Sequence, residues 1–106
     1  MEVELKKYTD RELRFVLKDE DKHTLPNIIA KLALRKNGVV YAAYIIDHPL
    51  VSYPEVVILT DGSRDPLDVL IEVLEEAKRY AKSLLDAFNE ALERYGKEGG
   101  ANSSTG

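Results

Sequence analysis

The sequence contains no cysteine, and this absence excludes several kinds of chemistry at once. Without thiols the chain can form no disulfide framework, no thiolate metal site and no cysteine nucleophile. Long apolar runs are also missing: no segment reaches the length that spans a bilayer, and the charged start "MEVELKKYT" lacks the apolar core of a secretory signal. We therefore expect a soluble cytoplasmic protein with no membrane partner.

The chain also lacks an excess of positive charge. It has fifteen Lys and Arg against nineteen Asp and Glu, a formal net charge of -4. Proteins that bind phosphate backbones carry a strongly basic surface, so direct contact with nucleic acid is disfavoured. At 106 residues the chain is long enough for a single domain with a modest core.

The first regular pattern in the sequence is a pair of alternating segments. In "EVELKKY" the apolar residues Val3 and Leu5 alternate with charged neighbours, and in "ELRFVLK" Leu13, Phe15 and Leu17 do the same. This alternation is typical of half-buried strands. The polar stretch "TDR" lies between them, so the two segments are predicted to form a β-hairpin.

A short amphipathic helix is predicted from Thr24 to about Asn37 and Gly38. Its apolar positions have the spacing of one helix face: they are Leu25, Ile28, Ile29, Leu32 and Ala33. Glycine favours the left-handed backbone that ends many helices, which places the helix end near Gly38.

Two further strands are predicted in "VVYAAYII" and "EVVILT", and each carries apolar residues on both of its faces. Such strands need cover on both sides, or one side against the core and the other against a partner. The segment "DHPLVSYP" between them is predicted to be a loop anchored by Pro49 and Pro54. Tyr41, Tyr44 and Tyr53 fit either ordinary sheet packing or an interface, where tyrosine is favoured.

One long helix is predicted to follow the Asp61-Gly62 turn. Asp65 is a good cap and Pro66 suits a first helical turn. The apolar stripe that follows has helical spacing as far as Tyr95, and it comprises Leu67, Leu70, Ile71, Leu74, Ala77, Ala81, Leu84, Leu85, Phe88 and Leu92. A helix of this length spans roughly 45 Å. Strands of ordinary length span only ~20 Å, so the C-terminal half of the helix needs another surface.

These elements predict an α+β fold with two layers, in which two helices, the second one long, pack on a four-stranded antiparallel sheet. We expect this domain to occupy residues 1–95. The last residues, 96–106, are dominated by Gly and Ser and contain nothing to bury, so they are predicted to be a disordered tail.

The segment "HTLPN" has two interpretations. His23 can act as a metal ligand or a general base when companions lie near it. Alternatively the segment only begins a helix: the Thr24 hydroxyl accepts a bond from a free backbone N–H, Asn27 reaches back as in a capping box, and Pro26 occupies a first-turn position. The helix-start interpretation explains every residue of the segment and is preferred.

Only one other histidine is present, His48, which follows Asp47. Adjacent residues on an extended chain point to opposite faces, so this pair alone does not form an acid–base dyad. A small metal-dependent enzyme using His23, Asp47 and His48 stays an alternative. We assign no catalytic, cofactor-binding or metal residue, and we expect neither a cofactor nor a small-molecule substrate.

Three segments together resemble the archaeal DNA-directed RNA polymerase subunit L family, small relatives of the dimerisation domain of the bacterial alpha subunit. These segments are "HTLPN", "AAYIIDHPL" and "ILTDGSRDPLDVL", and the resemblance extends from about Val3 to Tyr95. The chain has Pro26 where the family usually has glycine. The resemblance implies two helices on an antiparallel sheet and a role without catalysis, although the assembled polymerase is a nucleotidyltransferase.

The resemblance also implies partners. Members of this family pair with the alpha-like D subunit of the polymerase, are joined by the small N and P subunits, and support the two large catalytic subunits in transcription. The residues that match the family motifs are His23, Thr24, Leu25, Asn27 and Ile28 at the first helix, Asp47, His48, Pro49 and Leu50 in the loop, and Asp61, Gly62, Pro66 and Leu67 at the turn into the long helix.

We expect an obligate heterodimer in which the first and last helices pack against equivalent helices of the partner, burying more than ~2,000 Å². The expected interface residues are His23, Thr24, Leu25, Asn27, Ile28, Leu32, Leu84, Leu85, Phe88 and Leu92. Truncating Phe88 or Leu84 to alanine is expected to weaken binding by several kcal/mol. A homodimer that uses the same surface stays open as a further alternative.

Overall fold

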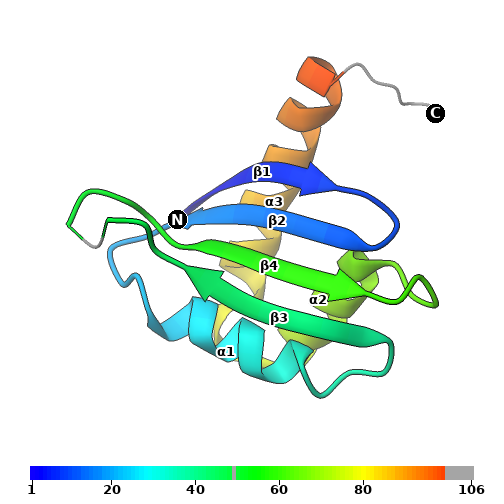
Figure 1. Ribbon diagram of the computed structural model, residues 1–106. Coiled ribbons are helices and arrows are strands. Elements are labelled where there is room, and N and C mark those ends of the chain that lie inside the picture. The colour runs from blue at the N-terminus through cyan, green and yellow to red at the C-terminus, as the bar shows by residue number, and fades with distance from the viewer. Residues whose placement is uncertain (49, 100–106) are drawn as a thin grey trace.

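The computed structural model of the chain describes residues 1–48 and 50–99. Its elements are β1 (Glu2–Tyr8), β2 (Glu12–Lys18), α1 (Thr24–Ala33), β3 (Val39–Ile45), β4 (Glu55–Thr60), α2 (Pro66–Glu76) and α3 (Lys78–Gly99). The four strands form one antiparallel sheet in the order β1-β2-β4-β3, and the helices form a second layer (Figure 1). The predicted two-layer α+β fold is confirmed.

The predicted hairpin is present as β1 and β2. Val3 pairs with Leu17, and Leu5 pairs with Phe15, so the apolar side chains of both strands lie on the same face of the sheet. All four are buried. The register of the β1–β2 pair shifts between Leu5 and Lys7, which marks an irregularity such as a β-bulge toward the C-terminal end of β1.

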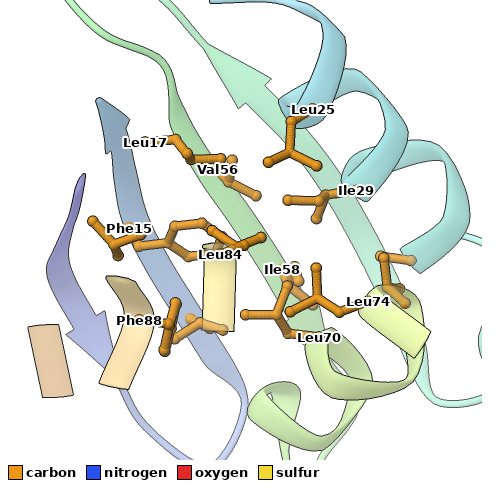
Figure 2. Packing of buried hydrophobic residues seen from close by; sticks show 14 of the residues in the cluster. Phe15, Leu17, Leu25, Ile29, Val56, Ile58, Leu70, Leu74, Leu84 and Phe88 are labelled. Atoms are coloured by element: carbon orange, nitrogen blue, oxygen red, sulfur yellow. The ribbon is translucent and has the colours of Figure 1, made fainter. Parts of the chain in front are cut away.

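The core lies between the sheet and the helices (Figure 2). Leu13, Phe15, Val56 and Ile58 project from the two central strands, and Ile29 meets them from α1. Helices α2 and α3 add Val69, Leu70, Val73, Leu74, Leu84 and Phe88 to the same cluster. Strands β1 and β2 therefore bury one face, as their alternation predicts, whereas β4 buries side chains on both faces at Val56, Val57 and Ile58.

The first helix begins at the predicted Thr24 but ends at Ala33, earlier than expected. Two bonds of the tighter i→i−3 kind close its end, from Arg35 N–H to the Leu32 carbonyl and from Lys36 N–H to the Ala33 carbonyl. Gly38 does have a positive φ of 85°. It lies in the connection to β3 rather than at the helix end, and its carbonyl accepts a bond from Asp61 N–H.

The prediction of one long last helix is wrong. The chain forms two helices, α2 and α3, separated by Ala77 with φ −94° and ψ 54°. The break turns α3 back over the sheet, where it packs chiefly against β1 (Figure 1). The described part of the chain thus has three helices instead of two, and the second half of the stripe covers the chain's own strands.

Helix α3 ends inside the segment predicted to be a disordered tail. The helix continues to Gly99, so it includes the first residues of the segment predicted to be disordered. Residues 100–106 lie outside the described part of the chain.

Candidate partner interface

The cap residue of α1 is His23, which makes no side-chain cap bond, and Asp21 rather than Thr24 supplies the carboxylate at this helix start. One carboxylate oxygen of Asp21 accepts bonds from the backbone N–H groups of His23 and Thr24, each at 3.0 Å. The expected side-chain cap from Thr24 and the return contact from Asn27 are therefore wrong. A bond from the Thr24 hydroxyl and these two backbone bonds lower the pKa of Asp21 to about 2. Pro26 lies in the first turn, as predicted.

His23 joins this helix start to the sheet. Its Nδ1 lies 3.3 Å from the Tyr44 hydroxyl on β3, and the ring tautomer determines which group donates. The two rings make an edge contact with centroids 6.0 Å apart. The Lys22 ammonium lies 5.4 Å from the Tyr53 ring centre, so α1, β3 and the loop before β4 meet at one corner.

The structure gives no support, within the described residues, to the alternative of a metal site at His23, Asp47 and His48. Among residues 1–48 and 50–99, no three His, Cys, Asp or Glu side chains lie together in a way that could hold a metal ion. Asp47 and His48 are exposed in the loop after β3. The His48 carbonyl accepts bonds from Val51 N–H and Ser52 N–H, which gives the predicted loop its turn. The expected role of Pro49 lies outside the described residues.

The start of α2 agrees with the sequence prediction. The Asp65 carboxylate accepts a bond of 2.8 Å from Leu67 N–H, with Pro66 as the first helical residue. Gly62 in the preceding turn has a φ of 94°, and a Cβ there would lie 2.8 Å from the Arg11 side chain. Glycine is favoured at this position, because other residues rarely adopt this positive φ.

A tyrosine that sequence reasoning missed holds the Asp65 cap. The Tyr8 hydroxyl at the end of β1 lies within hydrogen-bond distance of both carboxylate oxygens of Asp65, to which it donates at 2.8 and 3.0 Å. Partial burial and the bond to Asp65 both raise the pKa of Tyr8 well above its usual value. No local pattern in the sequence pairs residues so far apart, so only the fold reveals this contact.

The predicted interface residues fall into three groups. Four of them are exposed on the helix layer: His23, Thr24, Asn27 and Leu85. Three more are half-buried: Ile28, Leu32 and Leu92. Leu25, Leu84 and Phe88 are buried within the chain itself. Phe88 contacts Phe15 edge-on, with ring centroids 5.1 Å apart.

Exposed apolar side chains also lie on β3 and in the loop that follows it. Val40, Tyr41 and Ile45 on β3 are 62%, 48% and 46% exposed. Leu50 and Val51 in the adjoining loop are 94% and 79% exposed. The two-sided apolar pattern predicted either cover on both faces of this strand or one face against a partner, and the exposed side chains favour the second alternative.

Polar contacts from Arg94 join α3 to the edge of the sheet. Arg94 donates to the Val3 carbonyl at 3.0 Å and lies 3.9 Å from the Glu2 carboxylate. A surface hollow of about 270 Å³ opens beside Arg94, between α3 and the edge of the sheet. Its lining is mixed and mostly charged: Glu2, Glu4, Leu5, Lys18, Ala91, Arg94 and Tyr95.

Within the described ranges, no helix has the length and apolar character to cross a membrane.

Fold and surface together define a two-layer α+β domain that presents apolar side chains from its helices, its edge strand β3 and one loop, a surface typical of proteins that work in association. The sequence model of the RNA polymerase Rpb3/Rpb11 dimerisation domain matches residues 12–94. The chain belongs to this family.

Several relatives carry the name DNA-directed RNA polymerase subunit Rpo11. The protein from Methanocaldococcus jannaschii is 37% identical over 98 residues, covering 85% of this chain and 98% of the relative. That from Saccharolobus solfataricus is 37% identical over 86 residues, covering 81% and 92%. A crystal structure of DNA-directed RNA polymerase subunit L from Thermoplasma acidophilum has the same fold, with a TM-score of 0.62, 18% identity and coverage of 90% and 92% of the two chains.

Proposed function

We propose that this chain is a non-catalytic component of a cytoplasmic DNA-directed RNA polymerase and that it forms a heterodimer with the alpha-like D subunit. The observation that carries the proposal is the dimerisation-domain match over residues 12–94. An archaeal polymerase subunit that aligns along 98% of its length supports it. In this proposal the heterodimer binds the N and P subunits and forms the platform on which the two large catalytic subunits assemble.

The proposed contact surface is the helix layer. Leu85, Ile28, Leu32 and Leu92 supply apolar area, and the start of α1 supplies polar contacts through His23, Thr24 and Asn27. A mainly apolar interface of more than ~2,000 Å² is expected for an obligate pair. The net charge of -4 supports a role that does not involve binding nucleic acid directly.

Light scattering tests the proposal on the chain alone and on the chain mixed with the alpha-like D subunit from the same organism. We expect a lone chain that self-associates through its exposed apolar side chains and becomes a one-to-one complex when the alpha-like partner is added. A well-behaved monomer that ignores this partner would contradict the proposal. A stable particle of two identical chains that the partner leaves intact would favour the homodimer instead.

The metal-dependent alternative has lost its support. His23 contacts Tyr44, and within the described residues His23, Asp47 and His48 form no metal-binding group. Alanine at His48, which is exposed and lies outside the proposed contact surface, is therefore expected to leave binding of the alpha-like partner within about threefold of the unaltered chain.

A further inference from the structure

The break between α2 and α3 has no local cause in the sequence. Sharp helix breaks almost always occur at proline, at Gly/Ser pairs or where the backbone ladder takes an insertion. The sequence around Ala77 reads "LEEAKRY", which contains neither Gly nor Pro and consists mostly of good helix formers. The apolar stripe also keeps helical spacing across the break, from Leu70 and Leu74 to Leu84 and Phe88. Tertiary contacts must therefore hold the break in place.

Those contacts lie over the strands of the sheet. Leu84, Phe88 and Ala91 are buried by packing there, and Phe88 meets Phe15 in the core (Figure 2). The bond from Arg94 to the Val3 carbonyl adds a polar contact at the edge. Apolar contacts are not directional, so another amphipathic helix of similar shape can replace them.

The break also interrupts the backbone bonds of a continuous helix. The Ala77 N–H still donates to the Val73 carbonyl in the helical manner, at 2.9 Å. Beyond it, the last carbonyls of α2 and the first N–H groups of α3 lie at helix ends, where a continuous helix would pair them with each other. Joining the two helices would restore these bonds, which opposes the tertiary contacts that keep α3 folded back.

We infer that Ala77 is a hinge between a closed lone chain and an open assembled chain, an inference that rests on the proposed function. In the closed state α3 covers the chain's own strands β1 and β2. On assembly α2 and α3 join into one continuous helix, its outer half packs on the partner's sheet, and the equivalent helix of the partner replaces α3. The occupant is a subunit with the same dimerisation fold, because this chain matches the Rpb3/Rpb11 dimerisation domain over residues 12–94 and an equivalent helix would present a similar apolar stripe.

Proline at position 78 distinguishes the two states. Lys78 is the first residue of α3, where proline is tolerated because no helical N–H bond is needed. In a continuous helix the same proline would remove the bond to Leu74 and clash with its carbonyl. Lys78→Pro should therefore preserve the closed chain and oppose the open one, and Lys78→Ala is the matched control that removes the same charge.

The test combines binding and distance. We would measure binding of each full-length variant to the alpha-like D subunit, and the spin-label distance between Lys7→Cys and Asn89→Cys, sites that are free of interference because the chain has no other cysteine. The unaltered chain and Lys78→Ala should both bind this partner, and their spin-label distance should lengthen by about 10 Å or more on binding. The helix from the hinge to Asn89 is ~20 Å long, so straightening it moves the label far from β1. Lys78→Pro should bind at least tenfold more weakly, with the lone-chain distance retained.

Other outcomes separate this inference from the proposed function. Equal binding of Lys78→Pro and Lys78→Ala, or an unchanged distance in the heterodimer, would overturn the hinge and leave the heterodimer standing. No complex with the alpha-like partner for any variant would overturn both. If Lys78→Pro fails to fold, the distance in the unaltered complex decides alone. If two identical chains form a stable particle that the alpha-like partner does not dissociate, and the spin-label distance is lengthened in it, the choice of occupant would be overturned.

Discussion

Asp21 shows how one exposed carboxylate determines where a helix begins. Asp21 accepts bonds from the backbone N–H groups of His23, the residue before α1, and of Thr24, its first residue. A bond from the Thr24 hydroxyl and these two backbone bonds lower the pKa of Asp21 to about 2. The folded-state pKa lies below the ordinary 3.8. The resulting stabilisation is therefore complete above the unfolded-state pKa and is lost as the pH falls through about 2.

A carboxyl NMR titration would check this. We expect the Asp21 midpoint near pH 2 in the folded chain. Thr24→Val removes the hydroxyl that donates to Asp21, and the midpoint should then rise. A midpoint that stays at the ordinary value in the unaltered chain would contradict the capping role.

Tyr8 and Asp65 link two elements through one charged hydrogen bond. Tyr8→Phe should lower the free energy of unfolding by about 1–2 kcal/mol, because hydrogen bonds to charged groups contribute more than neutral ones. Urea unfolding would measure the change. The exposed Tyr41 on β3 offers the matched control: Tyr41→Phe should leave the unfolding midpoint nearly unchanged.

At the level of secondary structure, α3 combines core residues and surface residues on one helix. Phe88 is 2% exposed and contacts Phe15, whereas Leu85 is 37% exposed. Phe88→Ala should therefore cost about 3–5 kcal/mol of the chain's own stability, by loss of buried area and creation of a cavity. Thermal unfolding of the lone variant would show this loss before any partner is added.

Leu85→Ala isolates the proposed interface from the core. Since Leu85 is partly exposed, its truncation should change the stability of the lone chain by less than about 1 kcal/mol. Binding to the alpha-like D subunit should nevertheless weaken by about 1 kcal/mol or more, measured by calorimetry. Unchanged affinity would place the interface elsewhere on the chain.

The complete domain has a distribution of charge and apolar area that makes a prediction about salt. The net charge of the chain is only -4, and the proposed binding surface consists mainly of apolar helix faces. Any exposed ion pairs at its rim are screened by salt. The affinity for the alpha-like partner should change by less than about threefold between low and high salt, because electrostatic complementarity mainly affects association rate. A steep loss of affinity with salt would indicate an interface dominated by ion pairs.

The sequence by itself determined most of the local structure. Alternation in β1 and β2 predicted their hairpin, and Asp65 with Pro66 predicted the start of α2, because the physical signals for strands and caps lie within a few residues of each other. The order of three short segments also gave the family resemblance, which the match over residues 12–94 confirms at the level of the Rpb3/Rpb11 dimerisation domain.

Only the tertiary structure decided how distant segments meet. Local spacing favoured one long helix, but the free energy of burying Leu84 and Phe88 on the chain's own strands breaks it at Ala77. The Tyr8–Asp65 bond and the strand order β1-β2-β4-β3 likewise join residues far apart in the sequence. Such contacts depend on which surfaces become available after the chain has folded, and no short-range pattern contains that information.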